Sequence, residues 1–554
     1  PGAPPIFGRG SQLSSGMAVL TVRAMLFSVM NLRLKPFPIH LTALLAVCTV
    51  AEARIWTFPG IPDPVDAEFV AMSNNTVVLQ GANGKSCEVP LANFSPADQK
   101  YVIALASGGK IPLPEEPVAK PRASRSDYRE KSVETLTGPS VSMEPGTDLH
   151  ITGTGDPIAG CTIKFSASDG WLFFDKIPPS VVEKQFLDRF TVRGAKASVD
   201  KNLRITAYGP GSVVIPLHKD DPAALLFDGA SLSGTSLKLE PFVKYGDGKL
   251  SSMKSSAKSL LVKRGNMVTL AEKEDGTGIS VNYVAQDHDV VVNDLPAELQ
   301  ASLRFVRVFP WRWTSKKGIA GPIPENLNLG WYYDWNIGQN STPDLEYVAI
   351  KQKRYWPGLD QDWKRKGTVH LLGYNEPDKA DQAKMTVDEA ISGWPELLGT
   401  GLRLGSPAVS DGGLGWLYDF MKKADEKKLR VDFVAVHYYR ATADPGDARG
   451  AANQMRNFLE QIHERTKRPI WITEWNNGAN WTSAPDPNEK QQKAAIEAMI
   501  KMLDETPFVE RYALYNWVED CRMVKDKKNA LTPAGEAYRD KVSPVSFTQP
   551  RRSK

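Results

Sequence analysis

The sequence has few cysteines and histidines, and neither type is spaced like a set of metal ligands. Its 554 residues include four cysteines and seven histidines. Cys48 falls in an N-terminal segment that we expect to be removed, and Cys87, Cys161 and Cys521 lie in three separate regions. An odd number of scattered cysteines predicts neither a disulfide framework nor a metal cluster. We therefore expect a protein that works without a metal or cofactor.

An excess of charge of one sign and a long apolar run are also missing. The 68 basic residues nearly balance the 64 acidic ones, which leaves a formal charge of +4. Nucleic-acid binders concentrate positive charge on one face, so this balance makes no case for nucleic acid as a partner. After residue 53 no stretch is long and apolar enough to cross a bilayer. We expect no integral membrane segment in the mature chain.

The N-terminal residues resemble an export signal with extra sequence before it. Met30 opens a short basic region, Ile39 to Val50 is largely apolar, and Ala51-Glu52-Ala53 has the small-x-small cleavage pattern. We therefore assign residues 1–53 to an upstream extension and a signal peptide, and predict a secreted, periplasmic or cell-surface protein. A lipoprotein signal ending at Cys48 ranks lower, because Val47 is larger than that pattern tolerates.

Three regions precede the C-terminal half. Residues 54–107 read as a small β-rich module with a hairpin around Gly81 to Gly84, and they resemble the SH3-like homology domain first described in endocytic adaptor proteins. That resemblance implies a small β-barrel whose partner is unknown. Residues 108–149 have linker composition. Residues 150–300 read as an all-β ancillary domain, in part similar to a crystallin-type Greek key, and both glycan binding and a structural role stay open.

In residues 301–545 short apolar runs alternate with helical patterns, which predicts a (β/α)8 TIM-barrel domain. Four helices are clear, at Val387 to Thr400, Gly415 to Lys428, Gly450 to Thr466 and Asn488 to Glu505, whereas helices after the first three strands are poorly marked. The eight apolar runs begin at Leu303, Leu329, Leu345, Thr368, Arg403, Phe433, Ile470 and Tyr512. The predicted fold class is therefore multidomain, with a small SH3-like β-barrel and an all-β domain before the TIM barrel.

Two glutamates stand where apolar runs end. Glu376 lies in GYNEPD after the fourth run, and Glu474 lies in WITEWN at the end of the seventh. Barrel enzymes build their sites at the C-terminal ends of strands, so both carboxyls should face one cleft. Cleavage of a glycosidic bond needs such a pair, one protonated to release the leaving sugar and one ionised. The sequence therefore predicts a sugar-cleaving enzyme.

The motifs of this half resemble glycoside hydrolase family 128. The similarity rests on LLGYNEPD, GSPAVSDGG, DFVAVHYY, PIWITEWNNG and ERYALYNWVED. It implies a retaining β-1,3-glucanase in which Glu376 is the acid/base, Glu474 is the nucleophile and Asn375 binds the sugar hydroxyl beside the reacting carbon. We expect β-glucan as the partner and endo action. The alternatives are a glycosidase for another β-linked glycan, and a β-glucan-binding protein without catalysis.

Other strand-end residues are candidates for the same site. We expect burial and the charge of Glu474 to keep Glu376 protonated. Glu474 needs hydrogen-bond donors, and Asn375, His437, Tyr439 and Tyr515 are in position to supply them. Trp475 and Trp517 are predicted to stack on sugar rings. The residues that we expect to bind substrate are Asn375, His437, Tyr439, Trp475, Tyr515, Trp517, Trp311 and Tyr332. Core packing is the competing interpretation for Trp311, Tyr332, Tyr439 and His437, and for Trp313 stacking and core packing both stay open. Five rival carboxyls also lie near strand ends, namely Asp334, Asp378, Asp411, Glu519 and Asp520. We expect most of them to cap loops or pair with cations such as Arg307 and Arg522.

Overall fold

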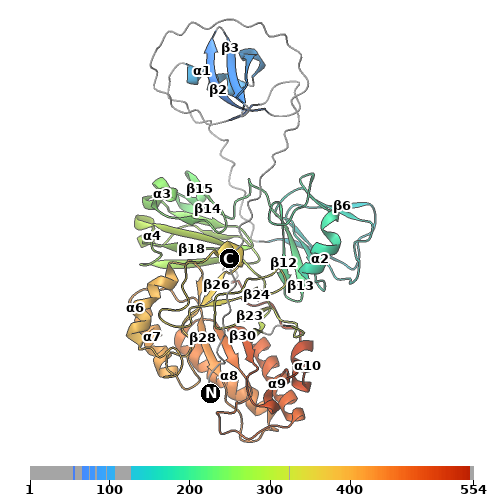
Figure 1. Ribbon diagram of the computed structural model, residues 1–554, viewed down its shortest axis with the longest axis vertical. Helices are drawn as coiled ribbons and strands as arrows, with labels where there is room; N and C mark the ends of the chain where they lie inside the picture. The colour runs from blue at the N-terminus through green and yellow to red at the C-terminus, as the bar shows by residue number, and fades with distance from the viewer. Residues whose placement is uncertain are drawn as a thin grey trace, which may run out of the picture. The chain divides into compact units, whose positions relative to one another are not determined.

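The computed structural model divides into two compact units, with the division after Val118 (Figure 1). The expected export signal, residues 1–53, lies outside the described residues. In the part of the chain that is described, no helix is long and apolar enough to span a bilayer. The described residues are 54–56, 65–73, 75–81, 84–94, 96–106, 127–322 and 325–549.

The first unit is a small antiparallel sheet with its own core. Its strands are ordered β1-β2-β3-β4, and the predicted hairpin joins β3 to β4. Trp56, Leu79, Phe94 and Val102 are buried in its centre. Closure into a barrel is not seen among the residues described. The elements are β1 (Arg54–Trp56), β2 (Val65–Ser73), β3 (Thr76–Gly81), β4 (Ser86–Pro90) and α1 (Pro96–Ala106).

The second unit begins with two sheets between which the chain alternates. β5, β7 and β9 pair in parallel in one sheet, while β6, β8 and β10 pair in parallel in the other. The prediction of a linker over residues 108–149 is therefore wrong from Asp127 onward, where β5 to β7 lie. The polar residues that suggested a linker are mostly exposed residues of these two sheets. These strands are β5 (Arg129–Val133), β6 (Ser140–Met143), β7 (Thr147–Ile151), β8 (Thr162–Phe165), β9 (Leu172–Phe174) and β10 (Phe190–Val192).

A hairpin and a short strand complete these two sheets. β12 (Leu203–Tyr208) and β13 (Gly211–Pro216) extend the sheet of β9, and β11 (Ala195–Lys196) pairs with β10. Helix α2 (Pro179–Phe186) buries Val182 and Phe186 in the core between the sheets.

Two antiparallel sheets follow and share one apolar core, as expected for a β-sandwich. The boundary predicted at residue 300 is wrong, because β21 (Phe305–Pro310) pairs antiparallel with β18 and β16 in this sandwich. The first apolar run is thus not a strand of the hydrolase-like domain. The other strands are β14 (Ala224–Phe227), β15 (Ser236–Leu239), β16 (Lys244–Tyr245), β17 (Ser259–Val262), β18 (Asn266–Ala271), β19 (Ser280–Ala285) and β20 (Val290–Val292).

The C-terminal domain has only parallel strand pairs, in two sheets ordered β24-β23-β22-β30-β29-β28 and β25-β26-β27. Its first strand is β22, which replaces the run at Leu303 in the predicted order. The ladders do not form one closed barrel, so that part of the expectation is not met. The strands are β22 (Lys317–Ala320), β23 (Trp331–Tyr333), β24 (Glu346–Tyr347), β25 (Ala349–Ile350), β26 (His370–Leu372), β27 (Arg403–Leu404), β28 (Val434–Tyr438), β29 (Ile470–Trp475) and β30 (Val509–Tyr515).

The four predicted helices are confirmed, and they cover the outside of these strands (Figure 1). Capping boxes start α6 at Thr386 and α9 at Asn488, where each side chain accepts the backbone N–H three residues on. Between β22 and β26 only the short helix α5 (Trp363–Lys366) occurs in the described residues. The longer helices are α6 (Val387–Leu398), α7 (Leu414–Glu426), α8 (Ala448–Thr466), α9 (Glu489–Glu505) and α10 (Pro533–Asp540).

Candidate active site

Glu376 lies four residues after the end of β26, where the backbone is held on both sides. Its N–H donates to the Ala408 carbonyl at 2.7 Å, and the N–H of Asn375 donates to the Gln352 carbonyl at 3.0 Å. Its φ of 39° is in the left-handed region, which a non-glycine residue rarely adopts. A Cβ on Gly373 would meet the Pro407 nitrogen at 2.7 Å, so only glycine allows the loops to approach this closely. The surrounding chain therefore fixes the direction of Glu376.

Glu474, in β29, accepts three hydrogen bonds from aromatic side chains. Its Oε1 accepts the Trp335 indole N–H at 2.8 Å and the Tyr333 hydroxyl at 3.1 Å. Its Oε2 accepts the Tyr439 hydroxyl at 2.6 Å. The Glu474 side chain is 9% exposed and that of Glu376 is 15% exposed, so both are largely buried. Three donors around one buried carboxyl suit an ionised group.

His437 connects the two carboxyls. Its Nδ1 lies 2.8 Å from Glu376 Oε1 and 3.4 Å from Glu474 Oε2, and the ring is fully buried. Both glutamates therefore face one small space, although they lie far apart in the sequence. The expectation of a common cleft for Glu376 and Glu474 agrees with this geometry. His437 sits within it as a bridging group.

The electrostatics of Glu376 differ from what we expected. Burial raises the pKa of Glu376, but the hydrogen bond and charge of His437, together with Lys379, outweigh it and lower the pKa below its ordinary value. The pKa of His437 is raised: burial lowers it, and the charges of Glu474 and Glu376 more than offset that burial. The expectation that burial and Glu474 would keep Glu376 protonated is wrong for this structure. Both shifts favour binding of the shared proton by His437 over binding by Glu376.

Aromatic rings surround the carboxyls. The Trp335 ring lies 5.7 Å from that of Trp517 and 5.9 Å from that of Tyr515, and Tyr515 lies 5.7 Å from Tyr439. Trp517 is 38% exposed and Trp481 is 56% exposed, so both offer ring surface to a ligand. The structure thus brings the predicted residues Tyr439, Tyr515 and Trp517 to the site.

The prediction that Trp475 and Trp311 bind sugar is wrong, because both side chains are fully buried. Trp475 packs against Tyr512 and Tyr538, since strand alternation turns it away from the side to which Glu474 points. The ring of Trp311 packs against His370 and Phe547. Neither side chain offers a face to a sugar. Trp313 is likewise fully buried, so its open role is resolved as core packing.

The prediction of Tyr332 as a site residue is wrong by one position along the strand. Its ring packs against Tyr347 at 5.2 Å, whereas its neighbour Tyr333 bonds Glu474. Successive side chains of a strand point to opposite sides, so only one of the two tyrosines can face the carboxyls. Sequence reasoning missed Tyr333, Trp335 and Trp481. The alternation in WYYDW contained the signal for the first two.

Asn375 is buried beside Glu376. Its Nδ2 donates to Gln382 Oε1 at 3.3 Å, while its Oδ1 has no hydrogen-bond partner among the described residues. A buried oxygen without a donor is uncommon and points to a missing partner. A sugar hydroxyl is one group that can supply that donor.

Four of the five rival carboxyls hold loops or pair with cations, as expected of most of them, and Asp334 instead bonds a tyrosine. Asp378 accepts the Ser410 N–H at 3.1 Å, and Asp411 accepts the Tyr439 N–H at 3.2 Å, so both brace loops at the site. Asp334 accepts the Tyr347 hydroxyl at 2.6 Å. Glu519 pairs with Arg522 at 2.7 Å, and Asp520 pairs with Lys527 at 2.9 Å.

Two segments match known families. Residues 311–538 match the family described as glycosyl hydrolase catalytic core, and residues 48–108 match SLA1 homology domain 1. The first match, together with the paired carboxyls, identifies the C-terminal domain as a glycoside hydrolase domain. The second identifies the N-terminal module as the SH3-like domain that the sequence resembled.

Individual relatives cover only parts of the chain. Alkali-sensitive linkage protein 1 of Schizosaccharomyces pombe is 29% identical over 199 residues, which are 34% of this chain and 35% of that protein. The chain thus spans about a third of the length of the curated relative it matches. Among solved structures, a GH128 subgroup I endo-β-1,3-glucanase of Amycolatopsis mediterranei with laminaritriose is 30% identical, with a TM-score of 0.36 over 41% of this chain and 98% of that chain. A curdlan-specific exo-β-1,3-glucanase of Blastomyces gilchristii is 28% identical, with a TM-score of 0.33 over 41% of this chain and 97% of that one.

Proposed function

We propose that the C-terminal domain hydrolyses β-1,3-glucan by double displacement, with Glu474 as nucleophile and Glu376 as acid/base. The observation that carries this proposal is the single histidine, His437, in contact with both carboxyls. The choice of β-1,3-glucan rests on the motif resemblance, and the paired carboxyls support glycoside hydrolysis in general.

The first step joins the enzyme to the sugar. Glu474, held by Tyr333, Trp335 and Tyr439, attacks the anomeric carbon and forms an ester while the glycosidic C–O bond breaks. Glu376 gives its proton to the departing oxygen. The proton that His437 Nδ1 shares with Glu376 across 2.8 Å is available to load the acid. In the second step Glu376 deprotonates a water molecule, which attacks the same carbon and releases Glu474.

The geometry favours retention of configuration. One nitrogen, His437 Nδ1, contacts an oxygen of each carboxyl, at 2.8 and 3.4 Å, so the two groups lie close together. Retaining enzymes hold their two carboxyls about 5–5.5 Å apart and inverting enzymes about 6.5–9.5 Å apart, so this closeness supports retention. We therefore propose a retaining enzyme. Proton NMR of the first product formed tests this, and an initial α-anomer would contradict it.

The proposal is tested with laminarin, by following new reducing ends. Wild-type protein is expected to release them, and Glu474→Ala is expected to lose about 10³-fold or more in turnover while it still binds the polysaccharide. Asp520→Ala, which removes an exposed carboxyl outside the site, is the matched control and should keep wild-type turnover. Binding of laminarin without cleavage by wild-type protein would favour the non-catalytic alternative. Cleavage of a different β-linked glycan only would favour the other glycosidase.

Endo action is also proposed, and the early products decide it. A mixture of oligosaccharides from long laminarin is expected, because attack within the chain yields fragments of several lengths. Release of glucose alone from the start would show exo action.

Two further proposals concern the chain around the site. We propose that the two parallel sheets are one eight-stranded ring, because Glu346 to Ile350 has one end in each sheet and single bridges join Gly405 to Phe433 and Val409 to Val436. We also propose export with cleavage near Ala53. N-terminal sequencing of protein recovered outside the cell tests it.

A further inference from the structure

The loop that follows the nucleophile strand carries the most exposed tryptophan of the described residues. It connects β29 to α9 and contains Trp481, which is 56% exposed. The Trp481 ring lies 4.9 Å from that of Tyr439 and 6.2 Å from that of Tyr515. Since Tyr439 bonds Glu474 directly, Trp481 is one side chain away from the nucleophile. Long loops without secondary structure next to a site are commonly functional.

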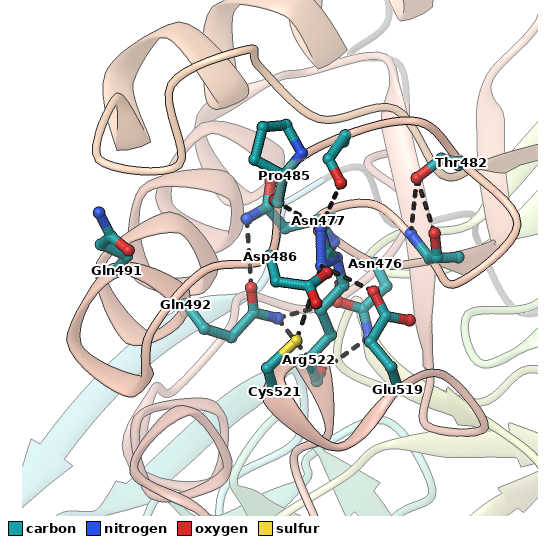
Figure 2. Close-up of polar contacts among 12 residues, drawn as sticks. Asn476, Asn477, Thr482, Pro485, Asp486, Gln491, Gln492, Glu519, Cys521 and Arg522 are labelled. Carbon is teal, nitrogen blue, oxygen red and sulfur yellow. Dashed lines mark hydrogen bonds and ion pairs between the residues drawn. The ribbon is translucent and has the colours of Figure 1, made fainter.

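One buried guanidinium binds both ends of this loop (Figure 2). Arg522 is fully buried, and its Nε donates to the Asn477 carbonyl at 2.8 Å. Its Nη2 donates to the Pro485 carbonyl at 2.9 Å, and its Nη1 donates to Glu519 at 2.7 Å. Residues 478–484, including Trp481, form the part of the loop between these two attachments.

A second set of buried hydrogen bonds joins the same loop to α9 and β30. Gln492 Nε2 donates to Asn476 Oδ1 at 3.0 Å and to the Arg522 carbonyl at 3.1 Å. Asn476 Nδ2 donates to the Tyr515 carbonyl at 2.9 Å, and Asn477 Nδ2 donates to Gln492 Oε1 at 3.1 Å. Arg522 is thus part of a network whose other members hold the strand ends that bear Glu474 and Tyr515.

The fit around Arg522 is close. Gly478 has a φ of +80°, and a Cβ at this position would meet Arg522 Nε at 2.8 Å. Only glycine therefore lets the loop turn over the guanidinium. Removing the guanidinium would leave the buried Asn477 carbonyl, the Pro485 carbonyl and the Glu519 carboxylate without this donor, which is costly in a partly buried network.

The same arginine explains an acidic cluster that resembles a metal site. Ligand atoms of Asp486, Glu519 and Cys521 lie within 4.8 Å of one another. The Arg522 Nη1 lies 2.7 Å from Glu519, 3.5 Å from Asp486 and 3.8 Å from the Cys521 sulfur. The position that a cation would take among these three groups is held by the protein's own cation. The cluster therefore serves the loop.

We propose that Arg522 is a positioning residue that clamps the two ends of segment 477–485 and thereby holds Trp481 as a sugar-binding wall beside Glu474. This inference rests on the proposed function, because the wall is assigned to the glucan that Glu474 attacks. Arg522 itself does not touch the substrate. It acts through the loop.

A double-mutant cycle on laminarihexaose tests the proposal. Trp481→Ala is expected to lower kcat/KM about three- to tenfold, mainly through a higher KM, because a ring contact is lost. Arg522→Met is also expected to lower kcat/KM mainly through a higher KM. The double variant should show no larger loss of kcat/KM than Arg522→Met alone. Arg539→Met, which removes an exposed arginine paired with its neighbour Asp540, is the matched control and should leave both constants unchanged. Additive losses, or a fall in kcat with KM unchanged, would overturn the proposal.

Hydrogen exchange separates this proposal from the proposed function. In Arg522→Met the amides of residues 478–484 are expected to exchange about tenfold faster or more, while those of β29 keep their wild-type rates. Unchanged exchange in the loop would refute the clamp, whatever the substrate is. If wild-type protein cleaves no β-1,3-glucan, the proposed function fails and the exchange data still decide the role of Arg522. Should Arg522→Met not fold, Arg522→Lys, which keeps the charge and loses the forked geometry, is measured with an intermediate change expected.

Discussion

At the scale of single residues, His437 is the group through which the two carboxyls of the site influence each other. The pKa of His437 is raised by the charges of Glu474 and Glu376, and the pKa of Glu376 is lowered, after the effect of burial, by His437. The two groups therefore bind one proton as a pair. Their contacts explain why a strand-end histidine, which is often only a core residue, belongs to this site.

A change of His437 should move the pH dependence of activity. Above the raised pKa of His437 the pair has lost its proton, so wild-type kcat/KM falls on the alkaline side. In His437→Gln the proton must be on Glu376 alone, and a carboxyl with an ordinary pKa of about 4.3 binds it more weakly than an imidazole at about 6.5. The alkaline limb is expected to move to lower pH in a kcat/KM profile with soluble laminarin.

The control for this shift is a histidine outside the site. His463 of α8 contacts the Arg468 carbonyl, and His463→Gln should keep the wild-type profile. An alkaline limb in the same position in His437→Gln and wild-type protein would show that another group sets it.

At the scale of elements, buried charges join the parallel strands to one another and to the helices. Glu346 of β24 pairs with Arg511 of β30 at 2.9 Å and with His370 of β26 at 2.7 Å, and all three side chains are fully buried. Lys316, just before β22, donates to carbonyls at the end of α9, and Lys317, the first residue of β22, donates to carbonyls at the end of α10. Cations at helix C-termini are favourable, so each lysine fixes a helix onto the strands.

The buried histidine of this group predicts a loss of stability in acid. Burial lowers the pKa of His370 to about 4. A histidine whose folded pKa is below the unfolded value of about 6.5 contributes stability that is complete above 6.5 and is lost as the pH falls towards 4. The full loss, reached well below pH 4, is about 3 kcal/mol. The urea concentration at which half of the protein is unfolded should therefore decrease as the pH is lowered from 7 to 4.5.

His370→Asn is expected to weaken this pH dependence, because asparagine does not titrate. The control is His218→Gln, because His218 is half-buried and contacts Arg193 and Asp220 outside this group, and it should keep the wild-type slope. An equal slope in His370→Asn and wild-type protein would contradict the assignment.

At the scale of the whole molecule, each of the two units has a hydrophobic core of its own. The first unit is centred on Trp56 and Leu79, and the carboxyls, His437 and the aromatic rings of the site all belong to the second. A protein that begins at Ala119 is therefore expected to keep wild-type kcat/KM on soluble laminarin. Reducing-end assays of both forms at equal concentration check this, and a drop beyond about threefold would show that the N-terminal module takes part in turnover.

Periodicity and motifs predicted the domain order, the helices α6 to α9 and the strand ends that bear Glu376 and Glu474. These features depend on the local pattern of apolar residues, which a sequence displays directly. The pattern failed where the domain to which a strand belongs depends on its pairing partner. The apolar run of β21, for example, pairs with β18 and so belongs to the sandwich. It also failed for Trp475, because strand alternation sends neighbouring residues to opposite sides.

The sequence by itself determined that two carboxyls would stand at the ends of parallel strands, since residue type and position along the chain are enough for that. Only the tertiary structure decided what surrounds them. His437 between the carboxyls, Tyr333 and Trp335 on Glu474, and Arg522 under the Trp481 loop come from distant parts of the chain. Their contacts, and therefore the pKa values of the site, arise from packing in three dimensions, where distance along the sequence no longer matters.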